Sequence, residues 1–313
     1  MSFEITSELL ANITSSIEVS NDKAIVALFE EMHYADIAEI LDELSFDNVV
    51  YIIKLLDSEK TSAVLMELDE DIREKTLQNL SAKEIAEEVE ELDSDDAADI
   101  IGELSQERQE AVLSKIEDEE HVKEIEELLA YDEDSAGGLM AKELVKVNEN
   151  WTVLKCVREM RAQAEEVTRV HSIYVVDDND KLKGRLSLKD LLITSTKTAI
   201  SEVYIPKVDF VNVHDNLDEV SNKMRKYDLE AIPVIDNNGV LLGRITIDDI
   251  VDVIKEEADK DYQLAAGLTQ DVEADDSILQ LTKARLPWLF LGLLGGVGAF
   301  LIMVMFENTF DEN

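Results

Sequence analysis

Carboxylate side chains that recur at helical spacing are the residues of this sequence best suited to chemistry. Asp95 and Asp99 are four residues apart, and Asp249 and Asp252 are three apart, so each pair shares one face of an expected helix. Like charges at that spacing destabilise a helix by roughly 0.2–0.5 kcal/mol, and a cation held between them would reverse the sign. Asp95 could equally cap its helix, where a negative charge is favourable. The chemistry indicated is cation binding by oxygen ligands.

More acids continue this pattern after Asp252, namely Glu256, Glu257, Asp259 and Asp261. For any single acid, a solvated helix face is the simpler interpretation, and it is the clustering that favours a cation site. The single cysteine, Cys156, disfavours a zinc or iron centre. The histidines are scattered, and we interpret all of them as ordinary structural or surface residues: His33, His121, His171 and His214. We find no pairing of nucleophile and base, so we do not expect an enzyme.

The net charge narrows the class of partner. Seventy-one acidic residues against 29 basic ones give a formal charge of −42. Nucleic acid is disfavoured because its phosphates require a basic surface, and flat docking on anionic lipid is disfavoured for the same reason. Such a charge either solubilises the surface or creates a self-repulsion that bound cations would relieve.

Residues 1–130 have the pattern of short helices. Apolar residues recur at helical spacing in 35–44, 49–56, 85–92, 97–104 and 111–116. Ser45, Ser81 with Glu84, Ser94 and Ser105 are expected to cap helix starts. Ile37-Ala-Glu39 and Ile85-Ala-Glu87 are similar triplets. This weak repeat of helical hairpins predicts a superhelical stack.

After Tyr131-Asp-Glu-Asp-Ser-Ala-Gly-Gly-Leu-Met140 the pattern changes to strands and helices that occur twice, about 59 residues apart. Two adjacent glycines there indicate a turn or a close backbone approach. The first copy has strands at 172–177 and 182–186 and a helix at 188–193. The second has strands at 231–236 and 240–247, an Asn237-Asn-Gly239 hairpin turn and a helix at 248–254. We interpret this as an internal duplication.

The C-terminal part contains two further elements. A polar helix is expected from Asp252 toward Tyr262, followed by an irregular acidic stretch at 269–277. Residues 286–306 carry no charge and are long enough to cross a bilayer as a helix. Lys283 and Arg285 precede this run, which predicts that residues 1–284 are cytoplasmic. Its glycines would favour close helix packing in lipid: Gly292, Gly295, Gly296 and Gly298.

The duplicated unit resembles a CBS-domain pair. The supporting motifs are Lys183-Gly-Arg-Leu-Ser-Leu-Lys-Asp190 and Ile232-Pro-Val-Ile-Asp-Asn-Asn-Gly239 with Gly243-Arg-Ile-Thr-Ile-Asp-Asp249. With the acidic helical part, Asp95-Asp-Ala-Ala-Asp99, the Ala-Gly-Gly-Leu-Met junction and the Arg-x-Pro-Trp start of the apolar run, the whole chain resembles the MgtE family of magnesium channels.

This resemblance implies a multidomain fold. It consists of an all-α superhelical domain (1–130), an α/β CBS pair (131–200 and 201–254), a long linking or plug helix with a linker (255–284) and one transmembrane α-helix (285–307). Family members carry about five membrane helices, so we expect this chain to be a truncated form of a multi-pass protein of the cell (inner) membrane.

The function implied is that of a homodimeric channel whose cytoplasmic part senses Mg²⁺ and closes the pore when Mg²⁺ is abundant. Position by position, the resemblance implies carboxylate ligands at Asp95, Asp99, Asp218, Asp228, Asp249, Asp252, Glu257 and Asp261. It also implies backbone carbonyl ligands at Gly138 and Arg225. Lys260 stands where the family favours a carboxylate.

Nucleotide binding is the alternative function. CBS pairs often hold adenosine phosphates, and Lys189 and Asp190 fit that role, which makes ATP a possible second ligand beside Mg²⁺. Ser172 and Leu229 occupy the positions where an aromatic side chain would stack on the base. A membrane-tethered CBS module that senses adenine nucleotide, and a purely structural acidic adaptor, therefore remain the competing hypotheses.

Overall fold

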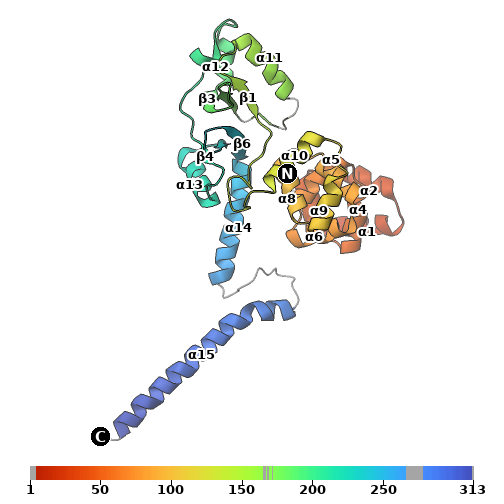
Figure 1. The fold of residues 1–313 in the computed structure, drawn as a ribbon. Coiled ribbons are helices and arrows are strands. Elements are labelled where there is room, and N and C mark those ends of the chain that lie inside the picture. The colour runs from red at the N-terminus through yellow and green to blue at the C-terminus, as the bar shows by residue number, and fades with distance from the viewer. Residues whose placement is uncertain (1–4, 165–166, 168, 171, 266–277, 312–313) are drawn as a thin grey trace. The chain divides into compact units, whose positions relative to one another are not determined.

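The computed structural model describes residues 5–164, 167, 169–170, 172–265 and 278–311 (Figure 1). The chain divides into two compact units, Met1–Ile247 and Asp248–Asn313. The first unit begins with a helical domain formed by α1 (Ser7–Glu18), α2 (Asp22–Phe29), α3 (Tyr34–Asp42), α4 (Phe46–Ile53), α5 (Ser58–Glu67), α6 (Glu70–Asn79), α7 (Ala82–Val89), α8 (Ser94–Gly102), α9 (Gln106–Leu113) and α10 (Glu119–Leu128).

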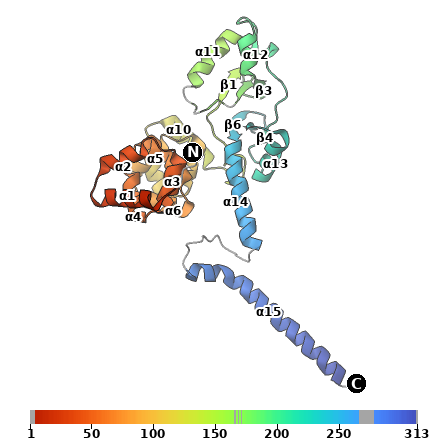
Figure 2. The same cartoon turned by 180° about the vertical axis from the view of Figure 1, so that it is seen from behind.

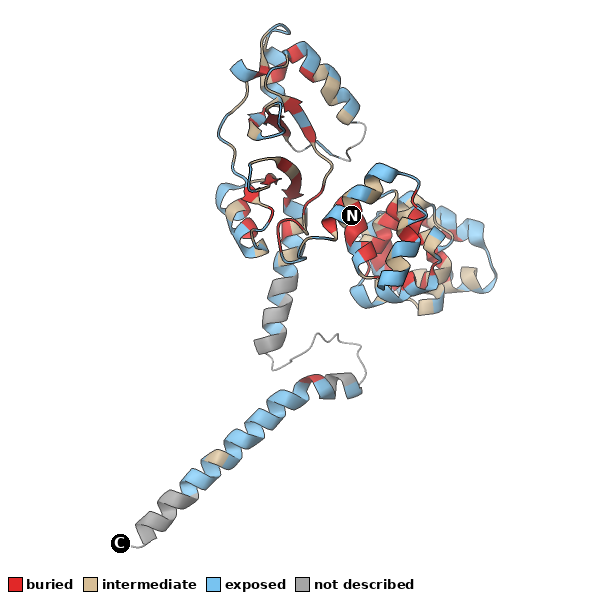
Figure 3. Cartoon of the chain, viewed as in Figure 1, coloured by how far each residue is buried: buried red, intermediate tan, exposed pale blue. Residues whose placement is uncertain are grey.

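The helical domain is a stack of short helices, and Figure 2 shows it from behind. Several helices pack against the one two positions further along the chain: α3 on α5, α4 on α6, α5 on α7, α7 on α9 and α8 on α10. Its core is aliphatic, with Ile37, Ile40 and Ile85 fully buried. Figure 3 shows buried residues gathered in the interior of this domain and exposed ones toward its outside. Helices of this length are marginal alone, so burial of one face against neighbours stabilises them. The predicted superhelical stack is confirmed.

Helix starts follow the predicted capping chemistry at some positions only. Ser81 and Glu84 form the expected reciprocal capping box at the start of α7. Ser45 and Ser105 occupy the N-cap positions of α4 and α9, although neither side chain makes a capping bond. The prediction for Ser94 is wrong: Asp93 is the N-cap of α8, and Ser94 is its first helical residue. Tertiary contacts of the Ser94 hydroxyl, given below, are the reason.

The CBS pair contains two three-stranded sheets of matching topology. The first copy comprises β1 (Val145–Asn148), α11 (Val153–Gln163), β2 (Ile173–Val176), β3 (Leu182–Leu186) and α12 (Leu188–Ile193). A short 3-10 helix (Ile200–Glu202) links it to the second copy, which comprises β4 (Val211–Asn212), α13 (Leu217–Tyr227), β5 (Ala231–Ile235) and β6 (Leu241–Thr246). In each sheet a parallel pair is followed by an antiparallel hairpin. The predicted duplication, both hairpins and the helix at 188–193 are confirmed. The parallel strands β1 and β4 were not predicted.

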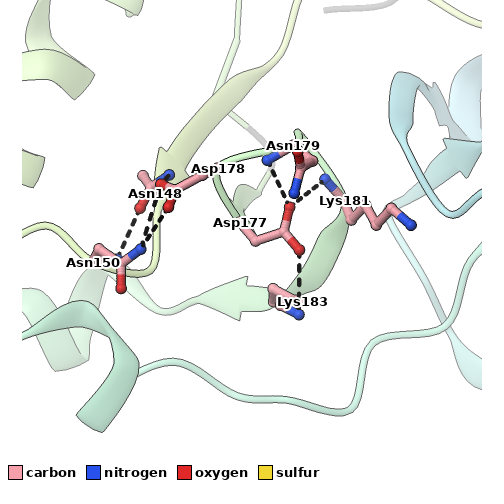
Figure 4. A network of polar contacts seen from close by, with 7 residues as sticks. All are labelled: Asn148, Asn150, Asp177, Asp178, Asn179, Lys181 and Lys183. Atoms are coloured by element: carbon pink, nitrogen blue, oxygen red, sulfur yellow. Dashed lines mark hydrogen bonds and ion pairs between the residues drawn. The ribbon is translucent and has the colours of Figure 1, made fainter.

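Each hairpin turn is closed by an aspartate. In the first copy, Asp177 accepts hydrogen bonds from the backbone N–H groups of Asn179 (2.9 Å) and Lys181 (3.1 Å) and lies 3.4 Å from the Lys183 ammonium. Figure 4 shows this network, beside which Asp178 accepts a bond from the Asn148 amide at 2.9 Å. Asp236 plays the same part in the second copy by accepting from the N–H groups of residues 238 and 240, both at 2.8 Å.

A junction segment, residues 131–144, connects the helical domain to β1. Ala141 exchanges two backbone hydrogen bonds with Arg244 of β6, at 2.8 and 2.9 Å. A Cβ atom added to Gly138 would lie 2.6 Å from the Asp132 carbonyl oxygen, so the close backbone approach predicted for the glycine pair is confirmed. The chain therefore contacts the second CBS copy before it forms the first.

The second unit is helical in its described residues. α14 (Ile247–Ala265) is one continuous helix, and it contains both the helix predicted at 248–254 and the polar helix predicted from Asp252 toward Tyr262. The predicted irregular stretch, 269–277, lies outside the described residues. α15 (Ile278–Asp311) contains a segment of 22 residues, Thr282–Met303, that is long and apolar enough to cross a membrane. A Cβ added at its predicted packing glycines would meet nothing within 4 Å.

Candidate metal centre

The N-terminus of α8 is built around Ser94, which is fully buried. Both oxygens of Glu143, in the junction segment, accept hydrogen bonds from it, one from the Ser94 N–H and one from the hydroxyl, each 2.9 Å long. The hydroxyl in turn accepts from the Lys142 N–H at 2.9 Å. The first N–H groups of a helix lack intrahelical partners, and here a carboxylate 49 residues away supplies one.

Three carboxylates converge at this point. One oxygen each from Asp93, Asp95 and Glu143 lie within 4.8 Å of one another, and all three residues are half-buried. Arg244 of β6 contacts the group from the CBS side: its Nη2 lies 3.3 Å from Asp93, and its Nε donates to the Glu143 carbonyl at 2.6 Å. The guanidinium thus contacts one carboxylate of the group and one backbone carbonyl. An arrangement of oxygen ligands alone suits a hard divalent cation.

Among the residues predicted to bind metal, Asp95 belongs to this group. Asp99 lies one turn further along α8 and is exposed. The spacing argument missed Asp93 and Glu143. Asp93 adjoins the acidic run that was singled out, so proximity could have suggested it. Glu143 carries no local signal, because only the fold of the junction segment brings it to α8.

A second group shares Glu143. His121 and Glu124, both on α10, place one ligand atom each within 4.8 Å of a Glu143 oxygen and of one another. Burial, and next the charge of Glu143, raise the pKa of Glu124 to about 7. His121 was interpreted as an ordinary structural or surface histidine, and the structure places it beside two carboxylates.

The ligands predicted on α13 lie at its two ends. Asp218 is exposed in the first turn, and Arg225 is in the last turn, where its guanidinium donates to Asn222 at 2.7 Å. Asp228 is the left-handed C-cap residue, with φ 50°. Ten residues of helix separate Asp218 from Asp228 by about 15 Å, so they do not share one ion. Gly138 lies in the junction segment, where its N–H donates to the Ser135 carbonyl at 3.0 Å.

The remaining predicted ligands lie on α14. Asp249 is half-buried and Asp252 is exposed, one turn apart. Glu257 and Asp261 are also one turn apart on this helix, and their side chains, like that of Lys260, lie outside the described residues. A site that joins α14 to the first unit stays a prediction.

The predicted nucleotide ligands lie on α12. Lys189 is exposed, and Asp190 is half-buried in the first turn. The Asp190 carbonyl accepts from both the N–H (3.1 Å) and the hydroxyl (2.6 Å) of Thr194, which ends the helix. Both residues therefore lie in the first turn of the helix that follows β3.

Comparison with known proteins gives two family matches. The MgtE intracellular N domain matches residues 32–134, and the CBS domain matches residues 136–195 and 200–256. The magnesium transporter MgtE of Thermus thermophilus is 38% identical over 183 residues, which is 58% of this chain and 41% of that protein. Its counterpart in Enterococcus faecalis is 34% identical over 184 residues, 59% of this chain and 40% of that protein. The chain thus spans about two fifths of the length of these curated relatives.

Two solved structures resemble the fold closely. The soluble part of a magnesium transporter superposes with a TM-score of 0.69 at 28% identity, covering 80% of this chain and 98% of that one. The cytosolic domain of the Mg²⁺ channel MgtE in complex with ATP superposes with a TM-score of 0.72 at 33% identity, covering 78% of this chain and all of that one. With an MgtE N domain followed by a CBS pair, and with that solved cytosolic domain covered from end to end, the chain belongs to the MgtE family of magnesium transporters.

Proposed function

We propose that this chain is the Mg²⁺-sensing, gating region of a magnesium channel or transporter. The observation that carries the proposal is the group formed by Asp93, Asp95 and Glu143, which joins the helical domain to the junction segment. Mg²⁺ is small and hard, takes oxygen ligands and keeps several of its waters. Three half-buried carboxylates beside one arginine suit such a partly hydrated ion.

Electrostatic repulsion supplies the mechanism. Two unit charges 4 Å apart interact by about 4 kcal/mol at an effective dielectric constant of 20. Without Mg²⁺, the carboxylates on the two sides of the junction repel one another and favour separation of the helical domain from the CBS pair. Mg²⁺ binds the compact arrangement better and shifts the population toward it.

The proposed output passes along the chain from β6 into α14, which follows it directly in sequence. In this proposal α14 is the plug at a pore, α15 is the first membrane helix, and the protein is a homodimer in the cell membrane. Further ions would bind at the other predicted ligands, namely Asp99, Gly138, Asp218, Arg225, Asp228, Asp249, Asp252, Glu257 and Asp261. The names of the relatives and the apolar length of α15 support this assignment.

Hydrogen exchange of the full chain in detergent tests the proposal. Addition of millimolar Mg²⁺ should slow exchange at residues 141–144 and in the first turn of α8. Asp95→Asn should weaken this response at least 10-fold. Asp47→Asn is the matched control, because Asp47 is an exposed aspartate in the first turn of α4. An unchanged Mg²⁺ response in Asp95→Asn would remove this group from the sensor.

Adenine nucleotide is the second candidate ligand, because one similar solved domain holds ATP and because Lys189 and Asp190 lie together at the start of α12. ATP titration by calorimetry, with Asp190→Asn as the variant, tests it. Binding of ATP that needs Asp190, without any Mg²⁺ response at the junction, would favour the nucleotide-sensing function over the magnesium-sensing one.

A further inference from the structure

The group formed by His121, Glu124 and Glu143 differs in chemistry from the oxygen-only group beside it. His121 and Glu124 are three residues apart on α10 and therefore share one face of that helix. Glu143 reaches them from the junction segment, and the three ligand atoms lie within 4.8 Å of one another. An imidazole with two carboxylates is a donor set that borderline divalent metals accept and that Mg²⁺ does not require.

A contact outside this group orients the imidazole. The Nε2 atom of His121 lies 3.3 Å from the carbonyl oxygen of Val89, the last residue of α7. A carbonyl oxygen only accepts, so this hydrogen bond requires the proton on Nε2, and in that tautomer the lone pair lies on Nδ1. Imidazoles that bind metals almost always donate their other ring N–H to a carbonyl or carboxylate in this way.

Glu143 is oriented in a comparable manner. Its two oxygens accept from the N–H and the hydroxyl of Ser94, and each oxygen retains a further lone pair for a metal. Hydrogen bonds of this kind to ligating carboxylates fix their direction. The nearby Lys142 ammonium lies 2.8 Å from Glu127, so a carboxylate outside the group already engages it.

We propose that His121, Glu124 and Glu143 bind a borderline divalent cation of the Zn²⁺ class. Zn²⁺ commonly takes three protein ligands at about 2.0–2.2 Å and one water. Tetrahedral ligands at that distance lie about 3.3 Å apart, so the three side chains need only small rotations to enclose an ion. Since Glu143 belongs to the junction segment, the bound ion fastens that segment to α10. This inference does not depend on Mg²⁺ sensing, although the two groups share Glu143.

Zn²⁺ affinity of the full chain in detergent, measured by competition with a chromophoric chelator, tests the proposal. His121→Gln should weaken binding at least 10-fold, as should Glu124→Gln, because each removes a ligand. His214→Gln is the matched control, since His214 is exposed and lies on another element; it should leave the affinity unchanged. Asp95→Asn should retain Zn²⁺ binding within about threefold while it weakens the Mg²⁺ response.

A structural role alone would not alter a metal spectrum. Visible absorption of Co²⁺, bound in place of Zn²⁺, should therefore appear in the wild-type chain and be lost in His121→Gln. Equal Zn²⁺ affinity in the wild type and His121→Gln would overturn the proposal, whatever the Mg²⁺ results. If His121→Gln does not fold, two other measurements test the proposal. The Zn²⁺ affinity of Glu124→Gln should be lowered, and the ring resonances of His121 should shift when Zn²⁺ is added to the wild type.

Discussion

The helical domain and the CBS pair both carry many carboxylates, but the surroundings of several of these groups differ between the two regions. In the CBS pair, the backbone N–H of Asn179 and then further donors lower the pKa of Asp177, and the Asn238 side chain and then backbone N–H groups lower that of Asp236. In the helical domain, burial raises the pKa of Glu88 to about 8 and that of Glu124 to about 7. The anionic form is thus favoured at the two hairpin aspartates and opposed at these two glutamates, although backbone N–H groups at helix starts lower the pKa of Glu84 and Asp118 in the helical domain as well.

Glu88 on α7 illustrates the second kind of surroundings. Its Oε2 is buried and has no hydrogen-bond partner within the described part of the chain. The acids that face it come from its own helix and its flank, Glu84, Glu87 and Glu91, and from Asp57 at the N-cap of α5. Desolvation and like charge both favour the protonated form.

This contrast separates two uses of acidic residues. Aspartates of the CBS hairpins are structural, because their own turns supply donors. In the helical domain, Glu88 and Glu124 are partly buried beside other acids, which favours their protonated forms. At the junction, Asp93 pairs with Arg244, which comes from the CBS pair. The difference indicates why the junction between the two regions is the place where cations would act.

We expect the largest loss of folding stability from Arg244→Ala. The Arg244 side chain is only 8% exposed and pairs with Asp93. Removal of one partner of a buried pair costs about 3–5 kcal/mol, and we expect the lower end because Asp93 keeps contact with water. Thermal unfolding measures this change.

Arg185→Ala is the matched control for that substitution. Arg185 occupies the equivalent position in the first CBS copy, pairs by register with the neighbouring strand in the same way, and is exposed. Its loss should change the free energy of unfolding by less than about 0.5 kcal/mol. Equal effects of the two substitutions would show that the duplication is symmetric in function and that the junction has no special role.

We expect an effect of intermediate size from Glu88→Gln, which should raise the stability of the folded state at alkaline pH. Because the folded-state pKa of Glu88 is about 8 against an ordinary 4.5, the folded protein binds the proton more tightly, and stability declines as the pH rises between those values. Glutamine cannot ionise, so the variant should be more stable than the wild type at pH 8.5 and similar to it near pH 4.

Denaturant unfolding across that pH range measures the difference. The exposed Glu107 on α9 provides the control, Glu107→Gln, which should leave the pH profile unchanged. A wild-type profile in Glu88→Gln would mean that the carboxyl is solvated, and the contrast between the two regions would then lose its best example.

The smallest effect is expected from Asp236→Asn. Donors lower the pKa of this carboxyl in the folded state, so its contribution is present above the ordinary pKa and is lost as the pH falls through the folded-state value. The variant should be slightly less stable than the wild type at pH 7, and the difference should be smaller at pH 3 because more of the carboxyl is protonated there. Urea unfolding at the two pH values measures this; a gain of stability at pH 7 would contradict the structural role.

Much of the local structure was determined by the sequence itself. The capping box of Ser81 and Glu84, the hairpin with its turn at Gly239 (φ 84°) and the helix at 188–193 each depend on interactions between residues a few positions apart. The acidic start of α8 and the apolar stretch of α15 were visible for the same reason. Side-chain periodicity and turn chemistry act over about one helical turn, so a single sequence displays them.

Only the tertiary structure decided the rest. The strands β1 and β4 are four and two residues long and exist because β2 and β5 pair with them. Ser94 does not cap its helix because Glu143 and Lys142 engage its hydroxyl. Ser94 and Glu143 are 49 residues apart, and Asp93 and Arg244 are 151 apart. The packing of whole domains brings such distant partners together. The sequence alone therefore predicted a cation site among acidic residues, and the fold decided which acids meet.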